Sequence, residues 1–311
     1  MVEDFPKLII ISGPTCSGKS VLAVELASIL GGQIINADSM QVYRGMDIGT
    51  AKLGVSERRG IPHHLIDIVD PDQEFNAALF RLHALPIIKD LHVKKIPTVV
   101  VGGTGLYVKA LLGGLFTCPP SKPALRQSLR EECEERGPSF LYQRLSRLDR
   151  EAAKSIHPMD KVRIMRALEV IHLTGFPFSE LTRKHGFSDT GFLALNLSLN
   201  VDRQVLYTRI NRRTMSMIDS GLISEVERLL TMGYSPELKP MQAIGYRHIV
   251  GYLKGRWNLD EATRLIQRDT RRYAKRQLTW LRADSDIVWV NPDDKPDIIN
   301  TVMAFMQRLD L

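Results

Sequence analysis

Short apolar runs alternate with longer amphipathic segments in the first third of the chain. The apolar runs have the length of buried strands and lie at 7–12, 33–37, 65–69 and 98–101. The segments at 19–30 and 77–93 have the length and periodicity of helices. Strands that alternate with helices of this length are typical of βαβ units, so we expect a parallel sheet.

The pattern changes at the proline-rich stretch 117–123. Helical patterns follow at 124–136, 138–147, 149–156 and 160–174, with a short one after Pro177, and an apolar strand pattern returns at 193–201. More helices, a weak strand at 287–290 and a final amphipathic helix complete the chain. We expect residues 1–117 and 192–311 to form a core and residues 118–191 to form an inserted helical domain.

A glycine-containing turn joins the first strand to the first helix. Gly13-Pro-Thr-Cys-Ser-Gly-Lys-Ser20 matches the pattern G-x-x-x-x-G-K-[ST] at every fixed position, in the strand–turn–helix context that this motif requires. The Lys19 side chain adds a positive charge, and the Ser20 hydroxyl can ligate Mg²⁺. We predict that a diphosphate binds to Gly13, Pro14, Thr15, Cys16, Ser17, Gly18, Lys19 and Ser20. The fold class is then α/β, a P-loop NTPase-like parallel sheet with helices on both faces and an inserted all-helical domain.

The neighbouring strand ends argue against simple ATP hydrolysis. An NTPase of this class needs an acidic residue at the end of a neighbouring strand to hold Mg²⁺, but the strand at 98–101 is followed by Gly-Gly-Thr-Gly. Asp38 does follow a strand, and the sequence leaves open whether it ligates Mg²⁺ or acts as a base on a substrate. The turn at 102–105 could offer N–H groups and the Thr104 hydroxyl to a ligand, or could be only a tight turn.

Charge is distributed unevenly along the chain. Residues 1–117 contain 11 basic and 11 acidic residues, and residues 118–311 contain 31 and 24, so the second part carries the whole net charge of +7. A basic half indicates a polyanionic partner, although composition alone equally allows a generally basic protein. No apolar run approaches the ~20 residues of a membrane span, and the acidic start predicts no signal peptide. Because Cys16, Cys118 and Cys133 are too scattered for a disulfide framework, we expect a cytoplasmic protein.

The segment 260–282 predicts a basic helix. At about 100° per residue, its cations gather within roughly 60° of one another, opposite an apolar stripe. The cations are Arg264, Arg268, Arg271, Lys275 and Arg282, and the stripe is Ile266, Tyr273 and Trp280. The helix after Asp202 adds Arg203, Arg209, Arg212 and Arg213. This surface is expected to contact a phosphate backbone, the alternative being an ordinary solvated face.

Seven segments, taken in order, resemble motifs of the tRNA dimethylallyltransferases (tRNA isopentenyltransferases) of bacterial type, and the resemblance spans nearly the whole chain. They are 13–20, Asp-Ser-Met-Gln-Val-Tyr-Arg-Gly-Met-Asp-Ile-Gly-Thr-Ala-Lys at 38–52, His-His-Leu-Ile-Asp at 63–67, Val-Gly-Gly-Thr-Gly-Leu-Tyr at 101–107, Arg-Ala-Leu-Glu at 166–169, Ala-Ile-Gly-Tyr-Arg at 243–247 and Lys-Arg-Gln-Leu-Thr-Trp-Leu-Arg at 275–282. Any one of these could arise by chance, but seven in order could not.

The resemblance implies a reaction that the residues alone do not supply. A dimethylallyl group would move from dimethylallyl diphosphate to the exocyclic N6 amine of adenosine 37, beside the anticodon of a tRNA. The phosphate loop and Mg²⁺ would hold the diphosphate, with Arg209 as a further clamp. Asp38 would receive the amine proton, and Thr104 would form a hydrogen bond in the reaction channel.

By the same matching, the helical insertion would grip the anticodon stem-loop of the tRNA from the side opposite the core. The protein is expected to be a monomer. The implied tRNA contacts are Asp38, Ser39, Met40, Gln41, Thr104, Arg126, Val162, Arg163, Ile164, Met165, Arg166, Gln242, Ala243, Ile244, Gly245, Tyr246, Arg247, Lys275, Arg276, Gln277, Leu278, Thr279, Trp280, Leu281 and Arg282.

Two departures from the family pattern and two other functions bear on this reading. Cys16 stands where the family more often has alanine, and the zinc finger of eukaryotic relatives is absent, so no zinc site is expected. The adjacent His63 and His64 are expected to pack or to form hydrogen bonds, because neighbouring side chains diverge on a strand. An adenylate isopentenyltransferase that uses a free nucleotide and an RNA-associated P-loop ATPase remain as alternatives.

Overall fold

Six parallel strands form one sheet in the part of the chain that the structure describes. The computed structural model describes residues 5–116, 119, 122–185 and 191–307. The strands are β1 (Lys7–Ser12), β2 (Gln33–Asn36), β3 (His63–His64), β4 (Thr98–Val101), β5 (Leu193–Leu199) and β6 (Val288–Val290). Their order is β3-β2-β4-β1-β5-β6, and each neighbouring pair is parallel. The predicted parallel sheet is confirmed, and the turn after β1 emerges between β4 and β5.

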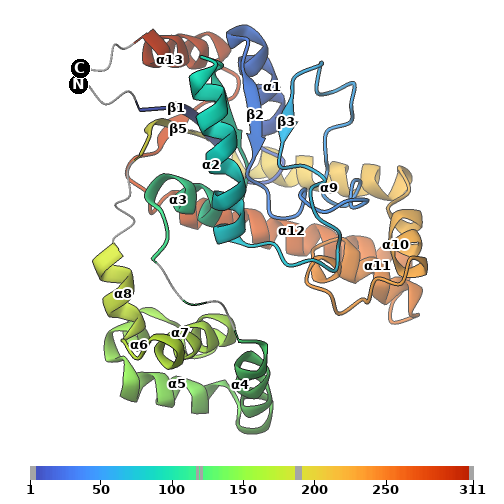
Figure 1. Ribbon diagram of the computed structural model, residues 1–311. Helices are drawn as coiled ribbons and strands as arrows, with labels where there is room; N and C mark the ends of the chain where they lie inside the picture. The colour runs from blue at the N-terminus through green and yellow to red at the C-terminus, as the bar shows by residue number, and fades with distance from the viewer. Residues whose placement is uncertain (1–4, 117–118, 120–121, 186–190, 308–311) are drawn as a thin grey trace. The chain divides into compact units, whose positions relative to one another are not determined.

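Helices cover both faces of this sheet. On one face, Ile9 of β1 packs in a buried cluster with Leu26 of α1 (Lys19–Leu30) and Val302 of α13 (Lys295–Gln307). The next residue, Ile10, points to the other face and is fully buried as well. Figure 1 shows α2 (Ala77–Val93) crossing the sheet on that side. Burial on both faces explains why these strands are continuous apolar runs.

The segment after β3 differs from the sequence prediction of a strand at 65–69. Leu65 and Asp67 have φ angles of 61° and 56°, in the left-handed region that a strand does not use. Val69 alone returns to form a single parallel bridge with Tyr43. The apolar pattern therefore reflects a loop in which Leu65 is buried and residues 66–69 are partly buried. The histidine pair has separate partners, as expected: the Nδ1 atom of His63 lies 2.8 Å from the Ile61 carbonyl oxygen, and the Nε2 atom of His64 lies 2.7 Å from Oε1 of Gln33.

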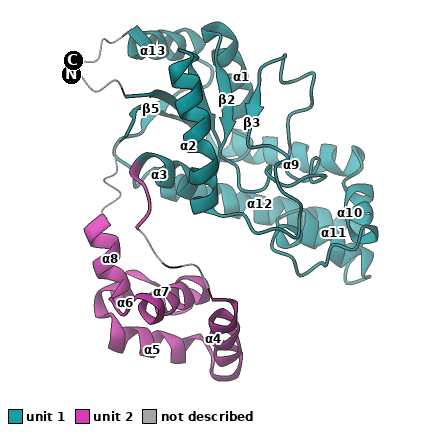
Figure 2. Ribbon diagram, in the orientation of Figure 1, with its two compact units in different colours: residues 1–112, 191–311 teal, residues 113–190 magenta. Residues whose placement is uncertain are grey.

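The chain divides into two compact units (Figure 2), residues 1–112 with 191–311 and residues 113–190. The sequence placed the boundaries at 117/118 and 191/192. In its described residues the second unit contains α4 (Pro123–Arg136), α5 (Pro138–Leu148), α6 (Arg150–Ser155), α7 (Lys161–Thr174) and α8 (Phe178–His185). It has an apolar core of its own, which includes Leu129, Leu141 and Ile164.

The first unit contains further helices, two of which pack against the turn after β1. They are α3 (Gly105–Gly113), α9 (Arg203–Asp219), α10 (Leu222–Thr231), the short 3₁₀ helix η1 (Pro240–Gln242), α11 (Tyr246–Leu253) and α12 (Leu259–Leu281). Leu206 and Ile210 of α9 pack against Ala274 of α12 and Cys16 of the turn. Among the described residues, no helix combines the length and hydrophobicity that a bilayer crossing requires.

Candidate active site

The predicted phosphate loop lies between β1 and α1. Gly13 and Gly18 have φ angles of 150° and 99°, which residues with a Cβ atom rarely adopt. The backbone N–H of Ser17 donates to the Pro14 carbonyl oxygen at 3.2 Å and closes the turn. Gly18 is the N-cap of α1 and offers no capping side chain, so the first N–H groups of the helix can meet an anion.

Two buried side chains of this loop have different environments. Cys16 belongs to the apolar cluster between α9 and α12, which explains why a small apolar residue fits there. The Ser17 hydroxyl is buried and has no hydrogen-bond partner among the described residues. A buried hydroxyl without a partner costs about 1–3 kcal/mol, and a phosphate oxygen in the loop would satisfy it.

The Lys19 ammonium group interacts with an acidic and with a basic side chain near the loop. Burial lowers the pKa of the Lys19 ammonium, the nearby Asp38 carboxylate raises it, and the Arg213 guanidinium lowers it again. A bound anion adds negative charge beside Lys19 and stabilises its charged form. The lysine is therefore placed to respond to a diphosphate.

Asp38 and Thr104 lie together at the ends of adjacent strands. Asp38 comes two residues after β2, and its Oδ1 atom accepts the Met40 N–H at 2.9 Å. The Thr104 hydroxyl, three residues after β4, accepts the Ser39 N–H at 3.0 Å. Ligands of open parallel sheets bind at this carboxyl edge. The structure thus brings together the two residues that the sequence singled out as catalytic candidates.

Glycine is required in the turn after β4, at 102–105, because other parts of the protein lie very close to its backbone. A Cβ atom on Gly102 would lie 2.1 Å from the Ala37 carbonyl oxygen, and one on Gly105 would lie 2.2 Å from the Trp280 ring. Neither position can carry a larger side chain without movement of its neighbours. This turn therefore lets Asp38, Thr104 and α12 approach one another, and it is more than a way to end a strand.

Gln277 of α12 links the phosphate loop to this turn. Its Oε1 atom accepts the Thr15 N–H at 2.8 Å, and its Nε2 atom donates to the Gly103 carbonyl oxygen at 2.9 Å. The side chain is buried. The sequence resemblance implies that Gln277 contacts tRNA; in the structure its amide forms hydrogen bonds to protein on both sides, so its observed role is to position the loop and the turn.

Replacing Gln277 with leucine, which has a similar volume, is expected to lower the free energy of unfolding by about 2 kcal/mol, since two buried hydrogen bonds are lost. The maximal turnover is expected to fall at least about tenfold, because small displacements of positioning groups are costly. Denaturant unfolding and steady-state kinetics measure the two effects. Unchanged turnover in a destabilised Gln277→Leu protein would show that Gln277 only packs.

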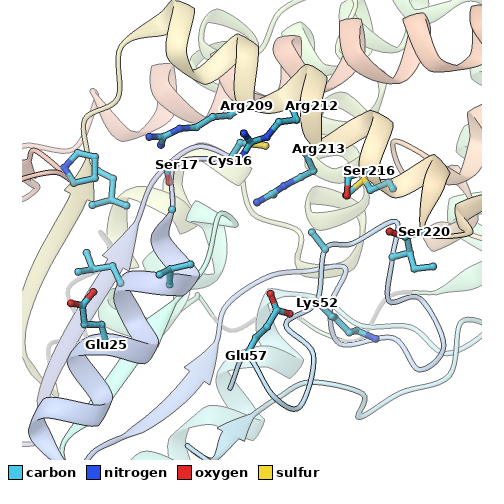
Figure 3. A pocket seen from close by; sticks show the side chains of 18 of the residues that line it. Cys16, Ser17, Glu25, Lys52, Glu57, Arg209, Arg212, Arg213, Ser216 and Ser220 are labelled. Atoms are coloured by element: carbon cyan, nitrogen blue, oxygen red, sulfur yellow. The ribbon is translucent and has the colours of Figure 1, made fainter. Parts of the chain in front are cut away.

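A cavity of about 880 Å³ opens on the side of the loop formed by α9. Figure 3 shows Arg209, Arg212 and Arg213 of this helix beside Cys16 and Ser17. None of the three arginines forms an ion pair within the described part of the chain. The sequence proposed only Arg209 as a diphosphate clamp. The spacing i, i+3, i+4 puts all three arginines on one helix face. From this spacing, Arg212 and Arg213 could have been predicted to lie beside the loop together with Arg209.

Two tyrosines near Asp38 are absent from the sequence-based site. Burial raises the pKa of the Tyr107 hydroxyl and of the Tyr273 hydroxyl, and the Asp38 charge raises both further. Both therefore stay protonated and can donate hydrogen bonds beside the carboxylate. Tyr107 is held by stacking on Phe80, with ring centroids 4.6 Å apart. The helical pattern assigned Tyr273 to a packing stripe, and only the fold reveals its position near Asp38.

Comparison with known proteins places this geometry in a family. A model described as IPP transferase matches residues 41–284, and one described as Isopentenyl transferase matches residues 6–66. The chain is 52% identical over 304 residues to tRNA dimethylallyltransferase 2 of Geotalea uraniireducens, covering 97% of this chain and 98% of that protein. The chain belongs to the IPP transferase family. It is also 51% identical to tRNA dimethylallyltransferase of Geobacter sulfurreducens, over 95% of each chain.

Solved IPP transferase structures have the same fold. The full-length tRNA isopentenylpyrophosphate transferase of Bacillus halodurans matches with a TM-score of 0.72 at 40% identity, over 97% of each chain. A eukaryotic dimethylallyltransferase described as acting on tRNA matches with a TM-score of 0.79 at 29% identity, over 96% of this chain and 77% of that one. The α/β fold with a P-loop-like core is confirmed.

The continuous ranges that the family motifs suggested as RNA contacts contain both buried and exposed residues. Five of those residues are buried: Ile164, Gly245, Tyr246, Gln277 and Leu281. A helix presents only part of its circumference to a partner, so consecutive residues cannot all contact it. The Tyr246 hydroxyl, for example, donates to Oε1 of Glu225 at 2.7 Å. Exposed members of the same ranges are Val162, Arg163, Gln242, Lys275, Arg276, Thr279 and Arg282.

Several cations of α12 are engaged within the protein. Arg264 pairs with Glu261 at 2.6 Å, Arg268 pairs with Asp269 at 2.9 Å, and Arg271 donates to Asn211 at 2.7 Å. Asp269 also pairs with Arg247 at 2.6 Å. The first half of the predicted cationic stripe is therefore partly neutralised by ion pairs, and whether it contacts RNA stays a prediction. At the other end of α12, Lys275, Arg276 and Arg282 form no ion pair with described residues, and this end is the stronger candidate for an RNA surface.

Proposed function

We propose that this protein transfers a dimethylallyl group from dimethylallyl diphosphate to the N6 amine of adenosine 37 in tRNA, giving N6-isopentenyladenosine. The observation that carries the proposal is the placement of Asp38 and Thr104 beside the phosphate loop. The Asp38 carboxylate is near enough to Lys19 of this loop to raise the pKa of its ammonium group. The names of the curated relatives support the same reaction. In the reaction, the C–O bond to the diphosphate breaks, the C–N6 bond forms, and one N6 proton is lost.

The donor's diphosphate fits the loop and the cavity beside it. The loop N–H groups, the Ser17 hydroxyl and Lys19 would bind the phosphate oxygens, and Arg209 would hold the outer phosphate. A Mg²⁺ ion fits the donor set, because magnesium is usually held by one or two protein oxygens, here the Ser20 hydroxyl, together with phosphate oxygens. When bound, the ion would neutralise charge that develops on the departing diphosphate.

The acceptor amine would meet Asp38 on the other side of the loop. Asp38 would accept the N6 proton, and its Oδ1 is fixed by the Met40 N–H. The Thr104 hydroxyl is oriented by the Ser39 N–H and can donate its own proton to an oxygen of the ligand. The target base has to leave its stack to reach this edge of the sheet, at a cost of a few kcal/mol.

Removing two cations at the end of α12, Arg276→Ala with Arg282→Ala, is expected to weaken tRNA binding. Because each phosphate contact releases counterions, the slope of log K against log salt should become shallower by about 1.4–1.8. Equilibrium binding at several salt concentrations measures this slope. Lys89→Ala with Lys94→Ala, which removes two exposed charges from the C-terminal part of α2 and the residue that follows it, is the matched control. If both variants have the wild-type slope, this end of α12 lies outside the interface.

The acceptor distinguishes this proposal from its alternatives. Labelled dimethylallyl diphosphate should pass to unmodified tRNA and not to AMP, whereas an adenylate isopentenyltransferase would use AMP. Recognition through the anticodon stem-loop, a monomeric state and a cytoplasmic location belong to the same proposal. An isolated anticodon stem-loop should replace whole tRNA as substrate, and gel filtration should give the mass of a single chain.

A further inference from the structure

Glu169, the last residue of the Arg-Ala-Leu-Glu motif, has no role in the reaction described above. It lies on α7 in the helical unit, and its side chain is 2% exposed. Its Oε1 atom accepts a hydrogen bond from Nε of Arg126 at 2.9 Å, and its Oε2 atom accepts one from Nη1 of Arg166 at 2.7 Å. One buried carboxylate thus holds two guanidinium groups, each on a separate oxygen.

The two arginines come from different helices. Arg126 belongs to the first turn of α4, and Arg166 lies one turn before Glu169 on α7. Their side chains are 39% and 38% exposed, so both guanidinium groups can be reached from solvent. The carboxylate fixes them from the protein side, and a ligand can approach from the other.

Charge and geometry at this place fit a phosphate group. Two guanidiniums against one carboxylate leave a net positive charge, and Arg163, one turn before Arg166 on α7, is a further cation, itself paired with Asp160 at 3.5 Å. Guanidinium groups bind phosphate oxygens through paired N–H groups. A long side chain loses conformational entropy when it binds, and a side chain already held by a buried carboxylate loses less.

We propose that Glu169 is a positioning residue that holds Arg126 and Arg166 as a preformed pair of guanidiniums for one backbone phosphate of the tRNA. This proposal rests on the proposed function and adds the reason why the motif ends in glutamate. The exchange of Glu169 for glutamine tests it, because the amide keeps the shape but can accept from only one arginine and repels the other.

In the full-length protein, Glu169→Gln is expected to raise the KM for tRNA about tenfold, with kcat and the KM for dimethylallyl diphosphate unchanged. The salt slope of tRNA binding should stay close to that of the wild type, because both cations are still present. In a protein that already carries Arg126→Ala and Arg166→Ala, the same exchange should have no further effect on tRNA binding. Glu132→Gln, which frees Arg144 from a 2.9 Å ion pair in the same unit, is the matched control and should behave as wild type.

Other outcomes overturn the proposal. A Glu169→Gln protein with tighter tRNA binding would mean that the carboxylate only neutralises the arginines. A full effect in the arginine-free background, or a loss of kcat that parallels a lower melting temperature, would make Glu169 a purely structural residue. If Glu169→Gln does not fold, Arg126→Lys with Arg166→Lys keeps the charges and removes the forked geometry, and a wild-type KM for tRNA in that variant contradicts the proposal.

Failure of this inference is distinct from failure of the proposed function. If Arg126→Ala with Arg166→Ala leaves the KM for tRNA unchanged in an active enzyme, the inference fails and the transferase reaction stands. If the wild-type protein transfers no dimethylallyl group at all, the proposed function fails, and the same variants in an equilibrium tRNA-binding measurement still decide whether Glu169 positions the two arginines.

Discussion

Exchange of Asp38 for asparagine is expected to lower the rate of dimethylallyl transfer by about 10³-fold while dimethylallyl diphosphate still binds. The amide can keep the hydrogen bond that Oδ1 of Asp38 accepts from the Met40 N–H, so the local turn should survive. It cannot accept the proton that N6 loses. General base catalysis typically contributes 10²–10⁴-fold, and this contribution is what the variant removes.

Single-turnover kinetics measure the rate of dimethylallyl transfer, and calorimetric titration measures the binding of dimethylallyl diphosphate. Asp72→Asn removes a carboxylate that is exposed on the surface, and it should leave both transfer and donor binding intact. Near-normal turnover of Asp38→Asn on tRNA would end the assignment of Asp38 as the base. Loss of donor binding in Asp38→Asn would instead favour the reading of Asp38 as a magnesium ligand.

Exchange of Lys19 for methionine is expected to lower kcat/KM for dimethylallyl diphosphate by about 10²–10³-fold, while tRNA still binds. The ammonium is the cation of the phosphate loop, and it meets the charge that grows on the departing diphosphate. Removal of one such preorganised donor typically costs this much. Lys89→Met, at an exposed position on α2, is the control for loss of a charge elsewhere. A Lys19→Met enzyme with wild-type kcat/KM would place the diphosphate outside the loop.

The same lysine gives a pH dependence. Burial lowers the pKa of Lys19, and only the charged form attracts the diphosphate. Donor affinity should therefore be complete at lower pH and should be lost as the pH rises through this lowered pKa, earlier than an ordinary lysine would allow. Titrations of donor binding against pH should show this alkaline loss in the wild type and not in Lys19→Met.

Local patterns were sufficient for the elements that build the catalytic edge. The helix at 19–30 and the phosphate loop before it are determined by neighbouring residues: two glycines that tolerate positive φ and a run of mainly apolar helix-forming residues that follows Lys19 and Ser20. The roles of Asp38 and Thr104 in one reaction channel come from the family resemblance, and their meeting in the structure agrees with a general property of parallel sheets, whose strands end at one edge.

Partners that are distant in sequence could not be predicted in the same way. Gln277 meets Thr15 across more than 260 positions, and nothing near Gln277 in the chain signals this. The charges of α12 have the same limitation, since Arg247 approaches Asp269 only through the packing of α11 on α12. Motif ranges carry no information about which helix face is buried, so the sequence could not distinguish the buried Tyr246 and Ile164 from exposed neighbours such as Arg163.

The central claim is that the phosphate loop holds an alkyl diphosphate whose carbon is transferred to an RNA amine. The most direct measurement supplies the purified protein and Mg²⁺ with carbon-labelled dimethylallyl diphosphate and unmodified tRNA, with ATP in a parallel reaction. The account predicts label on N6 of adenosine 37 after nuclease digestion, one pyrophosphate released for each label transferred, and intact ATP. Cleavage of ATP together with unreacted dimethylallyl diphosphate would contradict it.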